Sequence, residues 1–138
     1  MKLFKIIFTT ILLVASFASL AEISVIINTA NADSFDDQKI KRIYLGKIKA
    51  FSNGDRVNVL TLEDSAPETE QFRQNALKKS NSQFKSYWSK LAFTGKGTPP
   101  TEVSNSAEMI NAIKADSSSI GFIDSSAVTG DVKVIATF

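Results

Sequence analysis

The sequence predicts an α/β fold, a small, partly parallel sheet flanked by helices. Three observations support this prediction: β-rich runs alternate with helical segments, the helices have recognisable capping residues, and no repeat or low-complexity tract interrupts them. The chain has 138 residues, of which 43% are hydrophobic and 22% charged, which is typical of one globular domain.

The amino-terminal half of this fold is expected to contain two strands with a helix between them. The strands are predicted at 22–27 and 57–62. Asp36 is the predicted N-cap of the helix, and Gly46 is expected to end it. A turn around Asn53 precedes the second strand. The apolar face of the helix comprises Ile40, Ile43 and Tyr44.

Two capping boxes predict two further helices. Ser65 with Glu68 is expected to open a helix that runs to about Lys79, and Ser80 with Gln83 is expected to open the next. The spacing along this second helix predicts a core-facing stripe, made of Phe84, Tyr87, Trp88, Leu91 and Ala92. A fourth helix is expected at 106–115, and closing strands at 120–123 and 132–135.

The composition excludes much of hydrolytic enzymology. The chain has no cysteine and no histidine, which rules out disulfides, thiol catalysis, thiolate zinc sites, Ser-His-Asp triads and HExxH metalloproteases. The acids Glu63, Asp64, Glu68 and Glu70 crowd one helix end instead of facing each other across a cleft. An alternative interpretation of these four acids is a Ca²⁺ site, although their spacing matches no EF-hand loop. We therefore expect no enzyme, no cofactor and no metal.

The first 21 residues have the layout of a secretory signal peptide. Lys2 and Lys5 precede an apolar run from Ile6 to Leu20, and small residues at Ser19 and Ala21 predict cleavage after Ala21. The alternative is an uncleaved anchor, but a spanning helix needs about 20 apolar residues. Cleavage would leave a domain at 22–138 that does not span the membrane, in the periplasm of a Gram-negative-type cell or secreted.

Removing the signal peptide changes the charge balance. The whole chain has 16 basic and 14 acidic residues, and both lysines of the signal peptide belong to the excess. The exported domain is therefore neutral, and nucleic acid is not an expected partner.

Several segments together resemble the periplasmic substrate-binding proteins of phosphate ABC transporters. The matching segments are 26–28 (IIN), 43–48 (IYLGKI), 51–54 (FSNG), 87–88 (YW), 93–97 (FTGKG), 99–100 (PP) and 119–123 (SIGFI). The likeness runs from about Ser24 to Ile135. It implies a type 2 periplasmic binding-protein fold, of which this chain is long enough for a single lobe.

The resemblance also implies where an anion would bind. Family members carry an Arg-x-x-x-Ser-Gly-Thr type segment before a helix, whose backbone N–H groups hold phosphate. In the matching stretch here, Leu62 replaces the arginine, and Pro67 and Glu68 replace the glycine and threonine. The predicted capping box and the nearby acids would then neutralise this helix end. The candidate ligand-binding residues are Thr29, Asn31, Ser65 and Thr69.

Two functions of different classes follow. The first is a solute-binding-like protein that takes phosphate or a related small anion and meets a membrane permease or a periplasmic protein. The second is an interaction or assembly module that uses the fold without a ligand; in either case two copies forming a homo-oligomer are an option. The basic run at 39–49 is interpreted as a solvated face or a docking patch, and the Gly95–Thr98 segment as a plain turn.

Overall fold

The computed structural model describes residues 21–138; the predicted signal peptide lies outside the described residues except for Ala21. Along this part of the chain the elements are β1 (Ile23–Asn28), α1 (Asp37–Tyr44), β2 (Asn58–Leu62), α2 (Pro67–Ala76), α3 (Asn81–Phe93), β3 (Thr101–Val103), α4 (Ser106–Ala115), β4 (Ser119–Asp124), the short 3₁₀ helix η1 (Ser125–Ala127) and β5 (Val132–Thr137). None of the helices described is long and apolar enough to cross a membrane.

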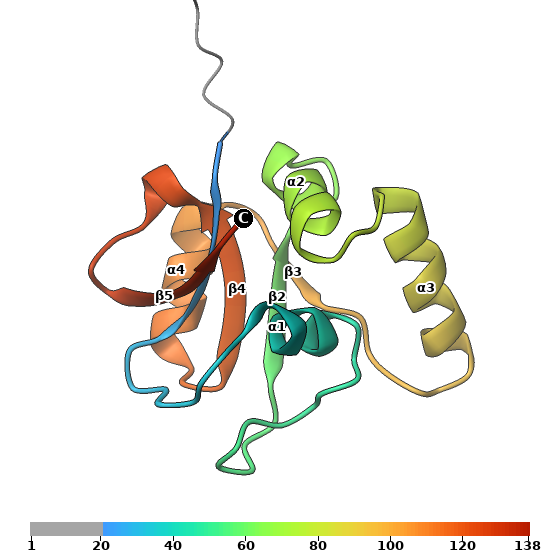
Figure 1. Ribbon diagram of the computed structural model, residues 1–138, viewed down its shortest axis with the longest axis horizontal. Helices are drawn as coiled ribbons and strands as arrows, with labels where there is room; N and C mark the ends of the chain where they lie inside the picture. Colours follow the sequence, from blue (N-terminus) through green and yellow to red (C-terminus); the bar gives the residue numbers. More distant parts are fainter. Residues whose placement is uncertain (1–20) are drawn as a thin grey trace, which may run out of the picture.

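The five strands form one mixed sheet in the order β3-β2-β4-β1-β5 (Figure 1). β2 is parallel to both β3 and β4, whereas β1 runs antiparallel to β4 and β5. The predicted α/β class with a small mixed sheet is therefore confirmed. The short strand β3 was not predicted, because its three residues are largely exposed and follow a proline-rich loop.

Helices cover both faces of this sheet. Neighbouring residues of a strand point to opposite faces. Phe122 of β4 stacks on Phe72 of α2 with ring centroids 4.1 Å apart, while a Cβ placed on Gly121 would lie 2.3 Å from Sδ of Met109 in α4. α2 and α4 therefore lie on opposite faces. α1 joins α2, since Tyr44 contacts the Phe72 ring at 4.7 Å.

The helix caps test the sequence directly. Asp36 and Ser80 cap α1 and α3 as predicted, and Ser80 with Gln83 forms the predicted capping box. The predicted capping box of α2 was wrong: its N-cap is Ala66, with no side-chain hydrogen bond. The Thr69 hydroxyl instead donates to the Glu63 carbonyl at 2.7 Å, because residues 63–66 form a tight turn before the helix.

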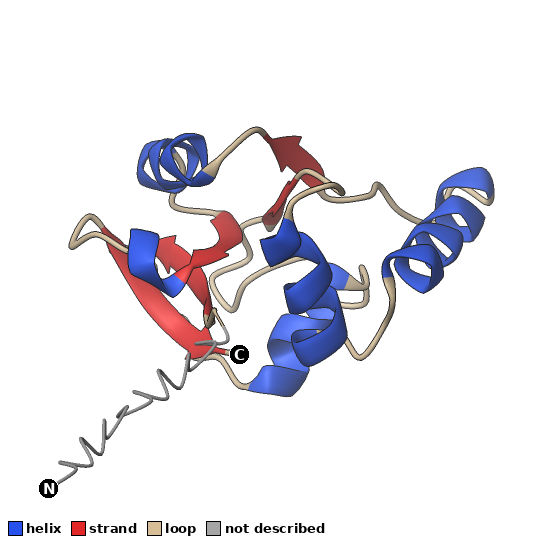
Figure 2. Cartoon of the chain, turned by 90° about the horizontal axis from the view of Figure 1, so that it is seen from above, coloured by secondary structure: helices blue, strands red, loops and turns tan. Residues whose placement is uncertain are grey.

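α3 stands at one side of the molecule, next to α2 and away from β1 and β5 (Figures 1 and 2). Two polar atoms of its aromatic residues attach it to the end of α1. The Trp88 indole N–H donates to the Tyr44 carbonyl at 3.1 Å, and the Tyr87 hydroxyl donates to the Leu45 carbonyl at 2.6 Å. Both acceptors are carbonyls that a helix end leaves without an intrahelical partner. Phe84 and Trp88 are buried, and Tyr87 and Leu91 pack partly buried against the core, so the predicted stripe is confirmed for these four residues. The prediction was wrong for Ala92, which is exposed.

Candidate functional site

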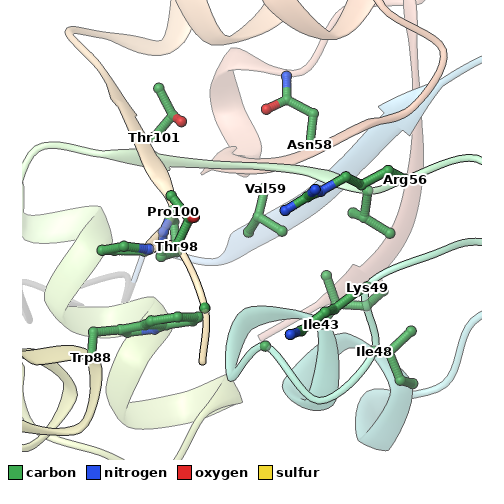
Figure 3. Close-up of a pocket in the computed structure, with 14 residues that line it drawn as sticks. Ile43, Ile48, Lys49, Arg56, Asn58, Val59, Trp88, Thr98, Pro100 and Thr101 are labelled. Atoms are coloured by element: carbon green, nitrogen blue, oxygen red, sulfur yellow. The ribbon is translucent and has the colours of Figure 1, made fainter. Parts of the chain in front are cut away.

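A cavity of about 200 Å³ lies between the end of α1, the amino ends of β2 and β3, and the Trp88 indole (Figure 3). Its polar lining includes Lys49, Arg56, Asn58, Thr98 and Thr101. Its apolar lining includes Ile43, Ile48, Val57, Val59, Trp88, Pro99 and Pro100. Cationic, neutral polar and apolar side chains thus line the same cavity.

A hairpin brings the segments that carry the two cations together. Ala50 and Arg56 form an antiparallel bridge, and the Val57 N–H donates to the Lys49 carbonyl at 2.9 Å. The tip of this hairpin is the predicted Asn-Gly turn, in which Gly54 has a φ of +90°. Lys49 and Arg56, seven positions apart in sequence, therefore both reach the cavity (Figure 3).

The electrostatics of the cavity favour an anion. No Asp or Glu belongs to its lining, whereas the three other cavities compared with it within residues 21–138 each include a carboxylate. Ion pairs in this part of the chain involve Lys39, Arg73, Lys85 and Lys114, not Lys49 or Arg56. The Lys49 ammonium donates to the Lys96 carbonyl at 3.0 Å, a neutral acceptor that leaves its charge uncompensated. An oxyanion here would meet two cations without a competing carboxylate.

Two glycines allow the backbone to approach the Trp88 indole closely. A Cβ on Gly46 would lie 2.7 Å from Cη2 of Trp88, and a Cβ on Gly97 would lie 3.0 Å from its Cζ3. Gly46 also has a φ of +71°, a conformation that favours glycine. These two glycines let the loops after α1 and α3 close around the indole, and so they define one side of the cavity.

The four ligand-binding residues expected from the sequence do not come together. β1 is antiparallel to β4 and β2 is parallel to it, so the carboxyl ends of β1 and β2 lie at opposite ends of the strands of the sheet. Thr29 and Asn31 follow the end of β1, while Ser65 and Thr69 follow the end of β2. The Lys49–Arg56 cavity lies at the amino end of β2, whereas Ser65 and Thr69 follow its carboxyl end.

In the pair after β2, Ser65 is exposed and the Thr69 hydroxyl is engaged within the chain. Thr69 is fully buried, and its hydroxyl is used by the Glu63 carbonyl. Asp64 pairs with Arg73 at 2.8 Å and with Lys85 at 3.1 Å. Partial burial raises the pKa of Asp64, but the hydrogen bonds from Arg73 and Lys85 outweigh it and hold the pKa below its ordinary value. The expected self-neutralised acidic helix end is thus corrected: Asp64 is compensated by cations of α2 and α3.

Of the pair after β1, Asn31 lies beside the Asp33 carboxylate, while Thr29 is exposed and does not line the hollow that Asn31 lines. Asn31 accepts a hydrogen bond from the Asp33 N–H at 2.9 Å and lines this hollow together with Asp33 and Ser52. The Ser52 hydroxyl and the Lys39 ammonium donate to Asp33 at 2.6 and 2.9 Å and hold the pKa of this carboxyl well below its ordinary value. Asp33 therefore ties the loop after β1 to the hairpin, and its charge opposes an anion in this hollow.

Asp33→Asn is expected to lower the free energy of unfolding at pH 7 by about 2 kcal/mol, because the Asp33 side chain is only 6% exposed and loses a charged acceptor. A carboxyl whose pKa is lowered by folding stabilises the folded state at pH values above its unfolded-state pKa of about 4. This stabilisation is lost as the pH falls towards the pKa of the folded state. The difference in the free energy of unfolding between wild type and Asp33→Asn should therefore shrink by up to about 1.4 kcal/mol per pH unit below pH 4. Urea unfolding at pH 7, 4 and 3 measures this.

The exposed Asp37 provides the matched control. Asp37→Asn should cost a few tenths of a kcal/mol at pH 7, since it removes only a charge in the first turn of α1. If the difference in the free energy of unfolding between wild type and Asp33→Asn stayed the same on acidification, the ionised Asp33 carboxylate would not be what stabilises this part of the fold.

Sequence reasoning missed Arg56 and Asn58 and placed Lys49 in a general basic run. The signal was the Asn-Gly turn: pairing the residues on either side of it puts Arg56 opposite Ala50, the residue after Lys49. What the sequence does not contain is the position of Trp88 and the loop 97–101 against that hairpin, which arises from tertiary packing.

No protein-family model and no curated protein sequence matches the chain. Solved structures do match. A phosphate ABC transporter substrate-binding protein from Clostridium perfringens with bound phosphate has a TM-score of 0.66 at 20% identity, covering 83% of this chain and 45% of that protein. PstS from Borrelia burgdorferi has a TM-score of 0.62 at 14% identity, covering 84% and 47%. An ABC-type phosphate transport receptor from Vibrio cholerae has a TM-score of 0.55 at 18% identity, covering 83% and 46%.

At these identities the similarity shows the fold. The chain spans a little less than half the length of the solved proteins it matches. The resemblance to phosphate ABC transporter binding proteins is confirmed at this level, and so is the single lobe of a periplasmic binding-protein fold.

Proposed function

We propose that this chain is an exported solute-binding protein that takes a small anion, phosphate or a related one, in the Lys49–Arg56 cavity. The observation that supports it is the pair of cations without a carboxylate in the cavity lining. The named activity of the solved neighbours, phosphate transport, supports the class of ligand. A membrane permease or another periplasmic protein would receive the bound anion.

Arg56→Gln is expected to weaken binding of the anion at least about tenfold. A guanidinium donates two parallel hydrogen bonds to an oxyanion, and a hydrogen bond to a charged group contributes about 1.5–3 kcal/mol. Isothermal titration calorimetry with inorganic phosphate, sulfate and phenylphosphonate measures the affinities at low and high salt. Because Arg56 is exposed, its attraction should also weaken as salt increases.

Arg42→Gln is the matched control, because Arg42 is also exposed but lies on α1 outside the cavity lining. It should leave every affinity within about twofold. If no anion binds at millimolar concentration, or if Arg56→Gln and Arg42→Gln behave alike, the proposed function is wrong.

A further inference from the structure

The apolar wall of the Lys49–Arg56 cavity has no role in binding a bare inorganic anion. Ile48 and Val59 line the cavity and are only partly buried, so their side chains retain surface for a ligand. Trp88, although largely buried, also lines the cavity. Phosphate is hydrated on all sides and gains nothing from such surfaces, whereas an apolar group transferred onto them leaves water favourably.

The size of the cavity agrees with a ligand that has both parts. Its volume is about 200 Å³. A protein cavity of about 150 Å³ lined by apolar side chains holds benzene. The space therefore accommodates a ring or a branched group of that size together with an anionic head at the rim, where Lys49 and Arg56 lie (Figure 3).

We propose that the preferred ligand is a small organic oxyanion, with an anionic head at Lys49 and Arg56 and one compact apolar group against Ile48, Val59 and Trp88. This inference rests on the proposed function and names the ligand class of the same site. Asn58 and the threonines at 98 and 101 remain available as neutral donors to the head.

Phenylphosphonate and inorganic phosphate form a matched pair of probes, since the first carries a phenyl group where the second carries an oxygen. Titration calorimetry on the purified protein should show that phenylphosphonate binds at least about tenfold tighter. Emission from Trp88, the single tryptophan of the chain, gives a second readout at the cavity wall.

Val59→Thr keeps the shape of the side chain but introduces a hydroxyl into the apolar wall. It should weaken phenylphosphonate about threefold to tenfold relative to phosphate. Val134→Thr is the matched control, because Val134 is 41% exposed on β5, outside the cavity lining. Ile48→Thr, in the loop after α1, repeats the test if Val59→Thr fails to fold.

The outcomes separate the two proposals. If phosphate binds as tightly as phenylphosphonate and both weaken in Arg56→Gln, the organic ligand is wrong and the anion site stands. If phenylphosphonate binds tighter but neither Val59→Thr nor Ile48→Thr affects it, the apolar group lies elsewhere and the inference is overturned. If neither anion depends on Arg56, the proposed function fails and this inference with it.

Discussion

Phe72→Ala is expected to lower the free energy of unfolding by about 3–5 kcal/mol, a large part of the 5–15 kcal/mol that stabilises a typical domain. Phe72 is 1% exposed and joins α2 to the sheet. Its ring stacks on Phe122 at 4.1 Å and meets the Tyr44 ring edge-on at 4.7 Å. Truncation would leave a cavity among rings that cannot collapse into it, because the Tyr44 hydroxyl is held by the Leu60 carbonyl at 2.8 Å.

The urea midpoint of unfolding, followed by circular dichroism, measures this effect. Phe93→Ala is the matched control, since Phe93 is 94% exposed at the end of α3 and its loss should change stability by less than about 0.5 kcal/mol. Similar costs for the two substitutions would show that the Phe72 cluster is not the centre of the core. Phe72→Leu should fall between them, because it fills part of the space.

Local features of the fold were predictable where a residue acts through its own neighbours in sequence. Asp36 caps α1 by accepting from the Lys39 N–H at 2.7 Å, a bond within one helical turn. The stripe containing Phe84 and Trp88 was predicted from spacing alone, because the apolar side of a helix is set by its period.

Predictions failed where two local options compete. The pattern Ser65-Ala66-Pro67-Glu68 satisfies a capping box, yet Pro67 also favours the first helical position, and the helix begins there. Thr69 then occupies a buried position in which its hydroxyl satisfies the Glu63 carbonyl. A residue expected to bind a ligand is thereby used to shape the turn before α2.

The candidate site was the least predictable part, because its members are joined only by folding. The hairpin sets Arg56 opposite Ala50, so that Lys49 and Arg56 line one cavity, and α3 brings Trp88 against the loops at Gly46 and Gly97. The family-like position after β2 lies at the other end of that strand, where Asp64 is paired with Arg73. Whether Lys49 and Arg56 are paired with a carboxylate depends on which acids lie near them in space, and the order of residues in the chain does not determine this.

Gly46→Ala is expected to lower the free energy of unfolding by about 3 kcal/mol and to disturb the cavity as well. Two costs combine at this position. An L-residue in the left-handed region, which Gly46 occupies at φ +71°, costs about 1–2 kcal/mol. The new Cβ would also lie 2.7 Å from Cη2 of Trp88, whose indole N–H is held by the Tyr44 carbonyl, so the ring must move or the loop must open.

The chain contains controls that separate these two costs. Gly95 has the same φ of +71°, but a Cβ added there would meet nothing within 4 Å, so Gly95→Ala should cost only the backbone term of about 1–2 kcal/mol. Gly97 lacks a positive φ but approaches the same indole at 3.0 Å, so Gly97→Ala should affect Trp88 with little backbone strain. Urea unfolding gives the stabilities, and Trp88 emission reports the position of the ring.

Gly46→Ala and Gly97→Ala should therefore shift the emission and weaken the binding of phenylphosphonate, the probe with an apolar group, while Gly95→Ala changes neither. If Gly46→Ala and Gly95→Ala cost the same and leave the emission unchanged, backbone conformation alone requires glycine at position 46. If the emission shifts but affinity is retained, the indole does not line the functional site. The joint loss of stability, emission and affinity at Gly46 is the result expected if packing of Trp88 between the two loops both stabilises this edge of the fold and forms the wall of the binding cavity.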